Sequence, residues 1–318
     1  MMRYPPLALF FRRRNSRIML LLLLALATIP CALSYVQHRG LSTLVDKYDA
    51  FILDQWGVLH DGKLLYPDVL NTLQQLKAAG KKLVMLSNSS KRKAASVRGL
   101  HKVGIDAGFF FDDDVVTSGE TAWRLLAQQG GISTLLSAVP RTGPLRVFVL
   151  GSGDDDDEYV RSSGNGNVPV DDPHACDVAL ARGTFTVGAA CFSSAEETMA
   201  SAALDAALAA LRRRGVPLLV SNPDLHRPGS GAPMPGQIGA RYQGPVHYVG
   251  KPHAAVFAEC MRCLPGLPRN RVCMVGLGSG SGLGLGLGLG LGLGLGLGLG
   301  LGLGLPTSHA CLAAASAW

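Results

Sequence analysis

Short apolar runs alternate with amphipathic segments in the first part of the chain. Phe51-Ile52-Leu53 is one such run, and residues 83–86 form another. Apolar runs of this length predict buried strands. Between them, Leu73 and Leu76 lie on one face of a segment that ends at Gly80, so a helix is expected there. Two strands joined by a single helix are usually parallel neighbours connected by a right-handed crossover. We expect this arrangement here.

The same alternation continues to residue 132. A second helix is expected over residues 91–103, and a third strand over residues 114–117. This rhythm of strand and helix is typical of an α/β fold with a doubly wound parallel sheet, often described as Rossmannoid.

A second α/β unit is expected after residue 133, where Gly, Pro and Ser accumulate. Its pattern predicts strands over residues 146–150, 177–180 and 216–220 and one long helix over residues 195–214. The first sheet is then expected to resume with a strand at 246–249 and to end with a strand at 271–276. We therefore divide the chain into a leader, a first part of the core, an inserted α/β unit, a second part of the core and a low-complexity tail, with the bounds 1–40, 41–132, 133–235, 236–276 and 277–318.

Residues 1–40 contain six Arg and no acidic residue, around an apolar stretch at 18–29. A secretory signal peptide, an organellar presequence and an uncleaved signal anchor all have this composition. We expect targeting to the secretory pathway or to an organelle, with the cytoplasm as the alternative. Six of the seven net positive charges lie in this segment, so no nucleic-acid partner is expected. A membrane is a partner only if the leader stays uncleaved.

Twelve Gly-Leu dipeptides run from Gly282 to Leu305. Alternate glycines weaken both helices and strands, so this tract is not expected to form secondary structure of its own. A membrane span, a repeat expansion and an error in reading the gene remain open. Because the tail stands where a core sheet would continue, the C-terminal part of the core is expected to be missing and an apolar sheet edge to be exposed.

Polar residues that could act in catalysis or binding follow the strands of the first unit. Asp54 ends the first strand, Ser87 and Asn88 end the second, and Lys251 follows the strand at 246–249. Ligands of open parallel sheets bind outside the carboxyl ends of the strands. These four side chains are therefore expected to meet at one site.

These motifs, in this order, resemble the haloacid dehalogenase superfamily over residues 41–276. The stretch from Asp54 to Gly62 is similar to its first motif, and the SNPD sequence at 221–224 and the GKP sequence at 250–252 are similar to its class IIA branch, in which the inserted unit is a cap. The Trp at position 56 matches a class IIA subgroup with a DxWGV motif.

The resemblance implies a phosphatase-type hydrolase of a small phosphorylated metabolite that acts through an aspartyl-phosphate. In that reading Asp54 is the nucleophile, Lys251 is catalytic and binds phosphate, and Ser87 and Asn88 also bind phosphate. The cap residues Asn222 and Asp224 would select the substrate. Mg²⁺ is the implied cofactor, with Asp54 and the backbone carbonyl of Trp56 as ligands.

The chain departs from the family pattern at two places. Trp56 stands where the family has a general acid, and Asp61 or His60 is a possible substitute for it. Leu277 stands where the family has a metal-ligating Asp, and no acidic residue follows Gly276. Two functions therefore stay open: an impaired Mg²⁺-dependent phosphatase, and a catalytically inactive phosphometabolite-binding or vestigial protein. The oligomeric state and the substrate are not predicted.

Two weaker signals do not change this picture. Cys260 and Cys263 have the spacing of metal ligands but no second pair of ligands nearby, so no metal site is expected. The acidic run at 154–158 is expected to be a solvated loop.

Overall fold

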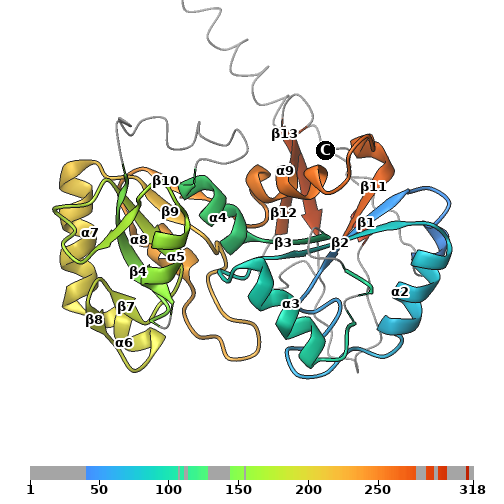
Figure 1. Ribbon diagram of the computed structural model, residues 1–318, viewed down its shortest axis with the longest axis horizontal. Coiled ribbons are helices and arrows are strands. Elements are labelled where there is room, and N and C mark those ends of the chain that lie inside the picture. The colour runs from blue at the N-terminus through green and yellow to red at the C-terminus, as the bar shows by residue number, and fades with distance from the viewer. Residues whose placement is uncertain are drawn as a thin grey trace, which may run out of the picture. The chain divides into compact units, whose positions relative to one another are not determined.

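The computed structural model describes residues 41–276, except 107, 111–113, 128–143 and 154, together with the backbone of three short strands further on (Figure 1). The chain divides into two parts, Met1–Gln37 and His38–Trp318, and both sheets described below lie in the second part. The predicted leader at 1–40 and Leu277 lie outside the described residues, so the predictions made for them are not tested by the structure.

The first sheet contains five strands in the order β14-β11-β1-β2-β3. Four of them are parallel, and β14 is antiparallel to β11. The elements of this part are η1 (Leu41–Thr43), β1 (Ala50–Asp54), α2 (Val69–Ala78), β2 (Lys82–Ser87), α3 (Lys93–Lys102), β3 (Val115–Thr117), α4 (Ser118–Leu126), α9 (Ala254–Arg262), η4 (Arg269–Arg271), β11 (Val272–Val275) and β14 (Ala313–Ala314).

Successive residues of the central strand β1 face opposite layers of helices. Ile52 is buried in a cluster with Leu125 of α4 and Val256 of α9. Phe51 is buried in a second cluster with Leu73 of α2 and Leu100 of α3. A strand that is apolar on both faces is typical of a parallel sheet covered on both sides. The predicted doubly wound α/β fold is therefore confirmed.

A second sheet is built by the inserted unit, in the order β10-β9-β6-β4-β7-β8, with β5 paired to β4. Its elements are β4 (Arg146–Gly151), α5 (Asp156–Ser162), β5 (Val168–Val170), β6 (Val178–Ala181), β7 (Thr186–Val187), β8 (Ala190–Cys191), α6 (Ala195–Ala200), α7 (Ala202–Arg214), β9 (Leu218–Val220), α8 (Pro235–Arg241) and β10 (Val246–Tyr248).

Two expectations for this second unit were wrong. The strand at 246–248 does not return to the first sheet, because β10 pairs in parallel with β9, Val246 lying opposite Leu218. An apolar run looks the same whichever sheet it joins, so its hydrophobicity could not decide between them. The single helix expected at 195–214 is two helices, because Ser201 has an extended backbone and its hydroxyl accepts a hydrogen bond from Leu204 N, which starts α7.

The Gly-Leu tract also differs from the expectation. Two of its segments, β12 (Gly284–Leu289) and β13 (Leu293–Gly298), pair as antiparallel strands with Leu opposite Leu and Gly opposite Gly. The strict alternation of Leu and Gly matches the two-residue period of a strand. The outer edge of β11, expected to be open, pairs with β14 through Met274 and Val275.

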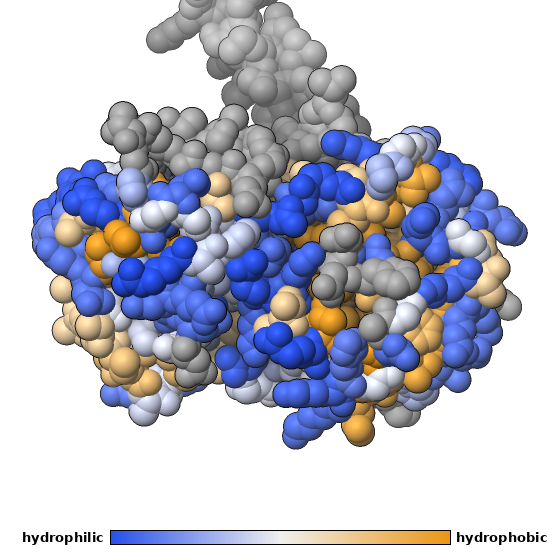
Figure 2. Space-filling model, in the orientation of Figure 1, coloured by the Kyte–Doolittle hydropathy of each residue, from blue (hydrophilic) through white to orange (hydrophobic). Residues whose placement is uncertain are grey.

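The surface is mostly hydrophilic on the face shown in Figure 2, with apolar side chains in smaller patches. Large exposed apolar residues include Trp56, Leu64 and Leu225. Within the described part of the chain, no helix has both the length and the apolar character needed to cross a membrane.

Candidate active site

Asp54 and Lys251 form an ion pair at the carboxyl end of the first sheet. The buried run from Ala50 to Leu53 ends at Asp54, whose side chain is only 16% exposed. Lys251 Nζ lies 2.5 Å from Asp54 Oδ1, and the backbone N–H of Gln55 donates to the same oxygen at 2.8 Å. The structure therefore brings together two residues that are 197 positions apart in the chain.

Asn88 connects the end of β2 to the loop that carries Lys251. Its Oδ1 accepts a hydrogen bond from Lys251 N at 2.7 Å, and its Nδ2 donates to Lys251 O at 3.2 Å. These two bonds hold the backbone of Lys251 in place. Ser87 lies beside Asn88, and its Oγ accepts a hydrogen bond from Ser89 N at 3.2 Å. Asn88 thus contacts Lys251 and Ser87 precedes it in the chain, and the role of these residues toward phosphate stays a prediction.

The loop after β9 brings residues of the second unit to the same place. Asp224 Oδ1 accepts a hydrogen bond from Asn88 Nδ2 at 2.9 Å. Asn222 is buried, and its Oδ1 accepts from Asp224 N at 2.9 Å, which forms a tight turn. A side chain at Gly250 would overlap Pro223 and come within 2.7 Å of Asn88 Oδ1, so this close approach requires glycine. The structure places Asp224 at the site, whereas Asn222 shapes the loop that holds it.

The loop after β1 is folded around Trp56 and His60. Trp56 is 43% exposed, and its ring packs edge-on against the ring of His60. Gly62 has a φ of 100°, and a Cβ there would overlap the Trp56 ring. Trp56 therefore has a structural role in this loop. That its carbonyl would bind a metal stays a prediction.

Neither of the two proposed substitutes for the missing acid is suited to that role. Asp61 is exposed, and its Oδ1 accepts hydrogen bonds from Lys63 N and Leu64 N, which lower the pKa of its carboxyl. His60 is buried and its Nδ1 accepts from Gly62 N, so the ring proton is on Nε2. Burial lowers the pKa of His60, and Nε2 has no partner among the described residues.

The described residues do not complete a magnesium site. No group of three or more His, Cys, Asp or Glu side chains converges anywhere in the described part of the chain. The end of β11 does lie beside Asp54, because a Cβ on Gly276 would be 3.8 Å from Asp54 Oδ2. Mg²⁺ is usually bound by one or two carboxylates in near-ideal octahedral geometry, and the carboxylate of Asp54 is already paired with Lys251.

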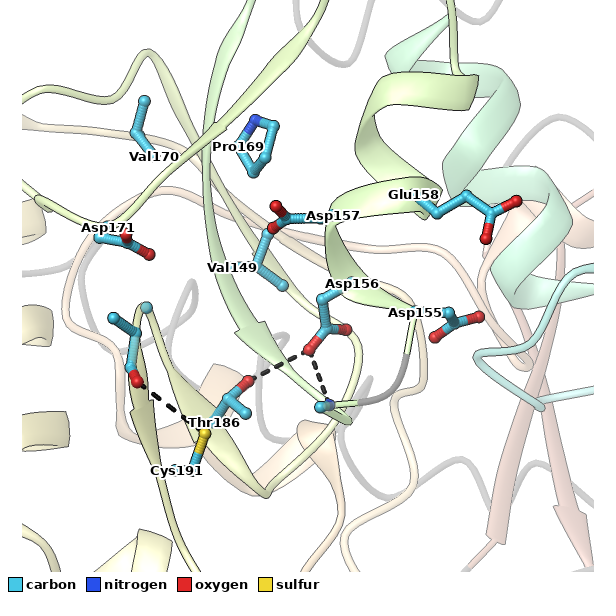
Figure 3. A pocket seen from close by; sticks show the side chains of 13 residues that line it. Val149, Asp155, Asp156, Asp157, Glu158, Pro169, Val170, Asp171, Thr186 and Cys191 are labelled. Atoms are coloured by element: carbon cyan, nitrogen blue, oxygen red, sulfur yellow. Dashed lines mark hydrogen bonds between the residues drawn. The ribbon is translucent and has the colours of Figure 1, made fainter.

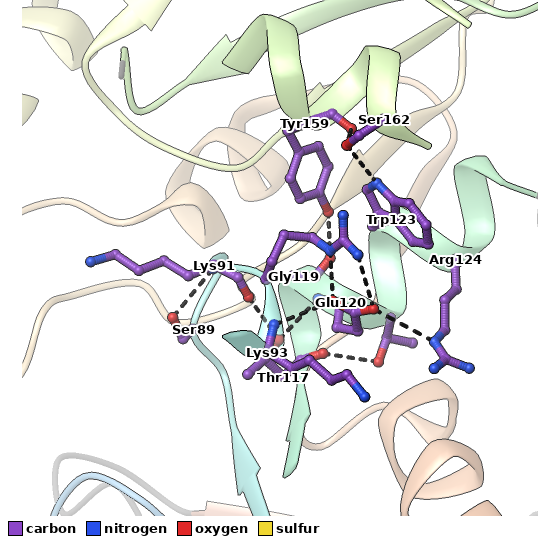
Figure 4. A network of polar contacts seen from close by, with 12 residues as sticks. Ser89, Lys91, Lys93, Thr117, Gly119, Glu120, Trp123, Arg124, Tyr159 and Ser162 are labelled. Carbon is purple, nitrogen blue, oxygen red and sulfur yellow. Dashed lines mark hydrogen bonds and ion pairs between the residues drawn. The ribbon is translucent and has the colours of Figure 1, made fainter. Parts of the chain in front are cut away.

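The loop after β2 is held by the start of helix α4, an interaction that the sequence reading missed (Figure 4). Gly119 N donates to Ser89 O at 2.9 Å, and Thr117 Oγ1 donates to Lys91 O at 2.7 Å. Glu120 is buried and accepts a hydrogen bond from Arg92 Nε at 2.6 Å. The Thr117-x-x-Glu120 spacing of a helix capping box was the available signal. This network fixes the backbone that follows Ser87 and Asn88.

The acidic run of the second unit is not simply a solvated loop. Asp155 and Asp156 both pair with the guanidinium of Arg182, whose side chain is 1% exposed. Asp156 also accepts a hydrogen bond from Thr186 Oγ1 at 3.2 Å (Figure 3). The pocket beside them has a volume of about 360 Å³ and shares no lining residue with the site around Asp54. Asp154, another member of the run, lies outside the described residues.

Comparisons with known proteins agree with this geometry. Residues 51–164 match the family described as haloacid dehalogenase-like hydrolase. A haloacid dehalogenase-like hydrolase from Brucella suis has a similar structure, with a TM-score of 0.59 and 22% identity over 76% of this chain and 82% of that one. The family match supports a relation to this superfamily over residues 51–164, and the likeness to the Brucella suis hydrolase shows a shared fold. No curated protein matches the chain.

Two further solved structures with the same fold are phosphatases. A 4-nitrophenylphosphatase from Thermotoga maritima is 25% identical, with a TM-score of 0.53 over 73% of this chain and 78% of that one. A glycerol phosphate phosphatase from Mycobacterium tuberculosis, solved with magnesium, is 20% identical, with a TM-score of 0.50 over 69% of this chain and 59% of that one. The likeness to the Thermotoga maritima enzyme, with the family match, supports a phosphatase-type hydrolase, whereas the likeness to the Mycobacterium tuberculosis enzyme shows the fold alone.

Proposed function

We propose that this chain is a phosphatase-type hydrolase of a small phosphorylated metabolite, of the class IIA kind, with Asp54 as its nucleophile. The observation that carries this proposal is the contact of 2.5 Å between Lys251 Nζ and Asp54 Oδ1 at the carboxyl end of the sheet. A largely buried carboxylate with one adjacent ammonium group can accept a phosphoryl group while the charge of that group is partly offset.

In the proposed reaction an oxygen of Asp54 bonds to phosphorus as the bond from phosphorus to the leaving oxygen breaks. The resulting aspartyl-phosphate is then cleaved by water, which regenerates the carboxylate. Dividing the displacement into two steps lowers each barrier. Lys251 would stay beside the phosphoryl oxygens, and the Ser87 hydroxyl with the backbone amides of the same loop would hydrogen-bond one of them.

The structure favours a second candidate function for one specific reason, the incomplete metal site. In the described part of the chain, no group of three or more His, Cys, Asp or Glu side chains could hold a metal ion. A phosphometabolite-binding protein without turnover needs only the ammonium group of Lys251 and the backbone amides of the loop after β2. Mg²⁺ dependence therefore remains a proposal based on the family resemblance, and no step above depends on it.

Turnover of p-nitrophenyl phosphate by the full chain, with and without Mg²⁺, tests the first function. We expect wild-type turnover to be lost in Asp54→Asn. Asp61→Asn is the matched control, because it removes the same charge from an exposed carboxylate on the next loop. A wild-type rate equal to that of Asp54→Asn would refute the phosphatase.

Calorimetry then tests the second candidate. Without turnover, binding of inorganic phosphate that is weakened by Lys251→Met would support the binding protein. Absence of such binding would refute it as well.

We further propose that residues 1–40 direct the chain to the secretory pathway or to an organelle. Their six arginines and apolar stretch support this. A fluorescent protein that carries these 40 residues and stays evenly distributed in the cytosol would contradict it.

A further inference from the structure

One carboxyl group from the second unit lies at the candidate site without an assigned chemical role. Asp224 is linked to the nucleophile by a chain of contacts through Asn88 and Lys251. Its Oδ1 is bonded to Asn88 Nδ2 at 2.9 Å, Asn88 Oδ1 is bonded to Lys251 N at 2.7 Å, and Lys251 Nζ reaches Asp54. Asp224 is half-buried, so part of its surface is open to a ligand.

The hydrogen bonds determine which oxygen of Asp224 can carry a proton. Lys251 N is a donor, so the atom of Asn88 that it contacts is the amide oxygen. The amide nitrogen of Asn88 therefore faces Asp224, and Asp224 Oδ1 is an acceptor. No described residue donates a hydrogen bond to Asp224 Oδ2. A proton on Oδ2 would leave every bond of this network intact and would be free to transfer.

The surroundings make this carboxyl easier to protonate than an ordinary aspartate side chain. Burial raises the pKa of Asp224, the hydrogen bond from Asn88 and the charge of Lys251 lower it, and the negative charge of Asp54 raises it. The net direction is upward. By contrast, Asp61 is exposed with a lowered pKa, and Trp56 has no acidic group. Among the acidic groups considered for this role, Asp224 is therefore the one with a raised pKa and a carboxyl oxygen that accepts no hydrogen bond from the described residues.

We propose that Asp224 is the general acid that protonates the leaving-group oxygen when the phosphoryl group moves to Asp54. This proposal rests on the phosphatase function proposed above. As the bond from phosphorus to the leaving oxygen breaks, its electron pair goes to that oxygen, which takes the proton from Asp224 Oδ2 and departs as an alcohol. Asp224 is left as a carboxylate. It recovers a proton from the water that attacks the aspartyl-phosphate. The second unit would thus supply the acid that the first motif lacks at Trp56.

The test compares two leaving groups in wild type and in Asp224→Asn. The p-nitrophenolate ion departs without being protonated, whereas phenolate is much more basic and benefits from an acid. The new Asn side chain can still accept the hydrogen bond from Asn88, so the contact between the two units is kept. Values of kcat/KM are compared because they exclude the later cleavage of the aspartyl-phosphate.

We expect kcat/KM for phenyl phosphate to fall by about 10²- to 10⁴-fold in Asp224→Asn, with little change for p-nitrophenyl phosphate. We expect Asp224→Glu, which keeps an acid, to recover part of the phenyl phosphate rate. An equal fall for both substrates would overturn the proposal, because a residue that only positions the substrate or the cap affects both alike.

Asp54→Asn separates failure of this proposal from failure of the proposed function. If wild type turns over p-nitrophenyl phosphate no faster than Asp54→Asn, the phosphatase and the acid are both refuted. If Asp54→Asn abolishes a clear wild-type rate and Asp224→Asn shows no dependence on the leaving group, only the role of Asp224 is refuted. Thermal unfolding of each variant establishes that it is folded.

Discussion

Gly119, near the start of α4, lies against the backbone of the loop that follows β2. A Cβ at this position would overlap the carbonyl group of Ser90 and come within 2.6 Å of Lys91 O. The neighbours are backbone atoms, so they cannot rotate away as a flexible side chain would. Gly99 in α3 offers a matched control, because a Cβ there meets nothing within 4 Å. Both residues are helical and neither has a positive φ.

The two Gly→Ala replacements should therefore have opposite effects on the free energy of unfolding. Alanine is favoured over glycine within a helix by roughly 0.5–1 kcal/mol, and Gly99→Ala should gain about this amount. Gly119→Ala makes the same gain but also overpacks the site, which typically costs about 1–3 kcal/mol. We expect a net loss of about 1–2 kcal/mol for Gly119→Ala.

Urea unfolding of the full chain, followed by tryptophan fluorescence, measures this difference. Thermal unfolding is a second measure, since 1 kcal/mol corresponds to roughly 2–4 °C in a protein of this size. The loss in Gly119→Ala should be accompanied by weaker phosphate binding, because the displaced loop follows Ser87 and Asn88. A Gly119→Ala variant as stable as Gly99→Ala would refute the overlap argument.

Three further predictions concern the site itself. Lys251→Met should weaken binding of inorganic phosphate in calorimetry at least tenfold, about 1.4 kcal/mol or more, because it removes the ammonium group beside Asp54; unchanged affinity would show that Lys251 does not contact phosphate. Burial lowers the pKa of His60 in the folded protein. As pH falls below about 6.5, the unfolded chain therefore protonates this imidazole before the folded protein does, and stability is lost. His60→Asn, whose amide oxygen can replace Nδ1 as acceptor for Gly62 N, should lose less stability between about pH 7 and 5 in urea titrations; identical pH profiles would contradict this. Leu277→Asp adds a carboxylate directly after Gly276, which lies beside Asp54, and should raise Mg²⁺ affinity in calorimetry, whereas Leu277→Asn should raise it less; equal affinity in wild type and Leu277→Asp would show that this position does not reach the site.

Several features of the fold could be predicted from the sequence, because the positions that become buried recur at regular intervals or in short apolar runs along the chain. The apolar runs of β1 and β2 and the helical spacing in α2 were visible, and so was the carboxylate at the end of β1. The position of β10 could not be read, because pairing with β9 depends on which edge is free in three dimensions. The pairing of Asp155 and Asp156 with Arg182 was missed because Arg182 lies 27 and 26 residues further along the chain, respectively.

The sequence by itself determined which residues have the chemistry for a phosphoryl-transfer site, since the identity of a side chain and its place at the end of an apolar run are local properties. Only the tertiary structure decided which of these residues contact one another. Asn88 and Lys251 are 163 residues apart, and Asn88 and Asp224 are 136 apart. Their hydrogen bonds exist only because two sheets place their loops together. The orientation of the Asn88 amide, and hence the free oxygen of Asp224, follows from that packing and from no pattern along the chain.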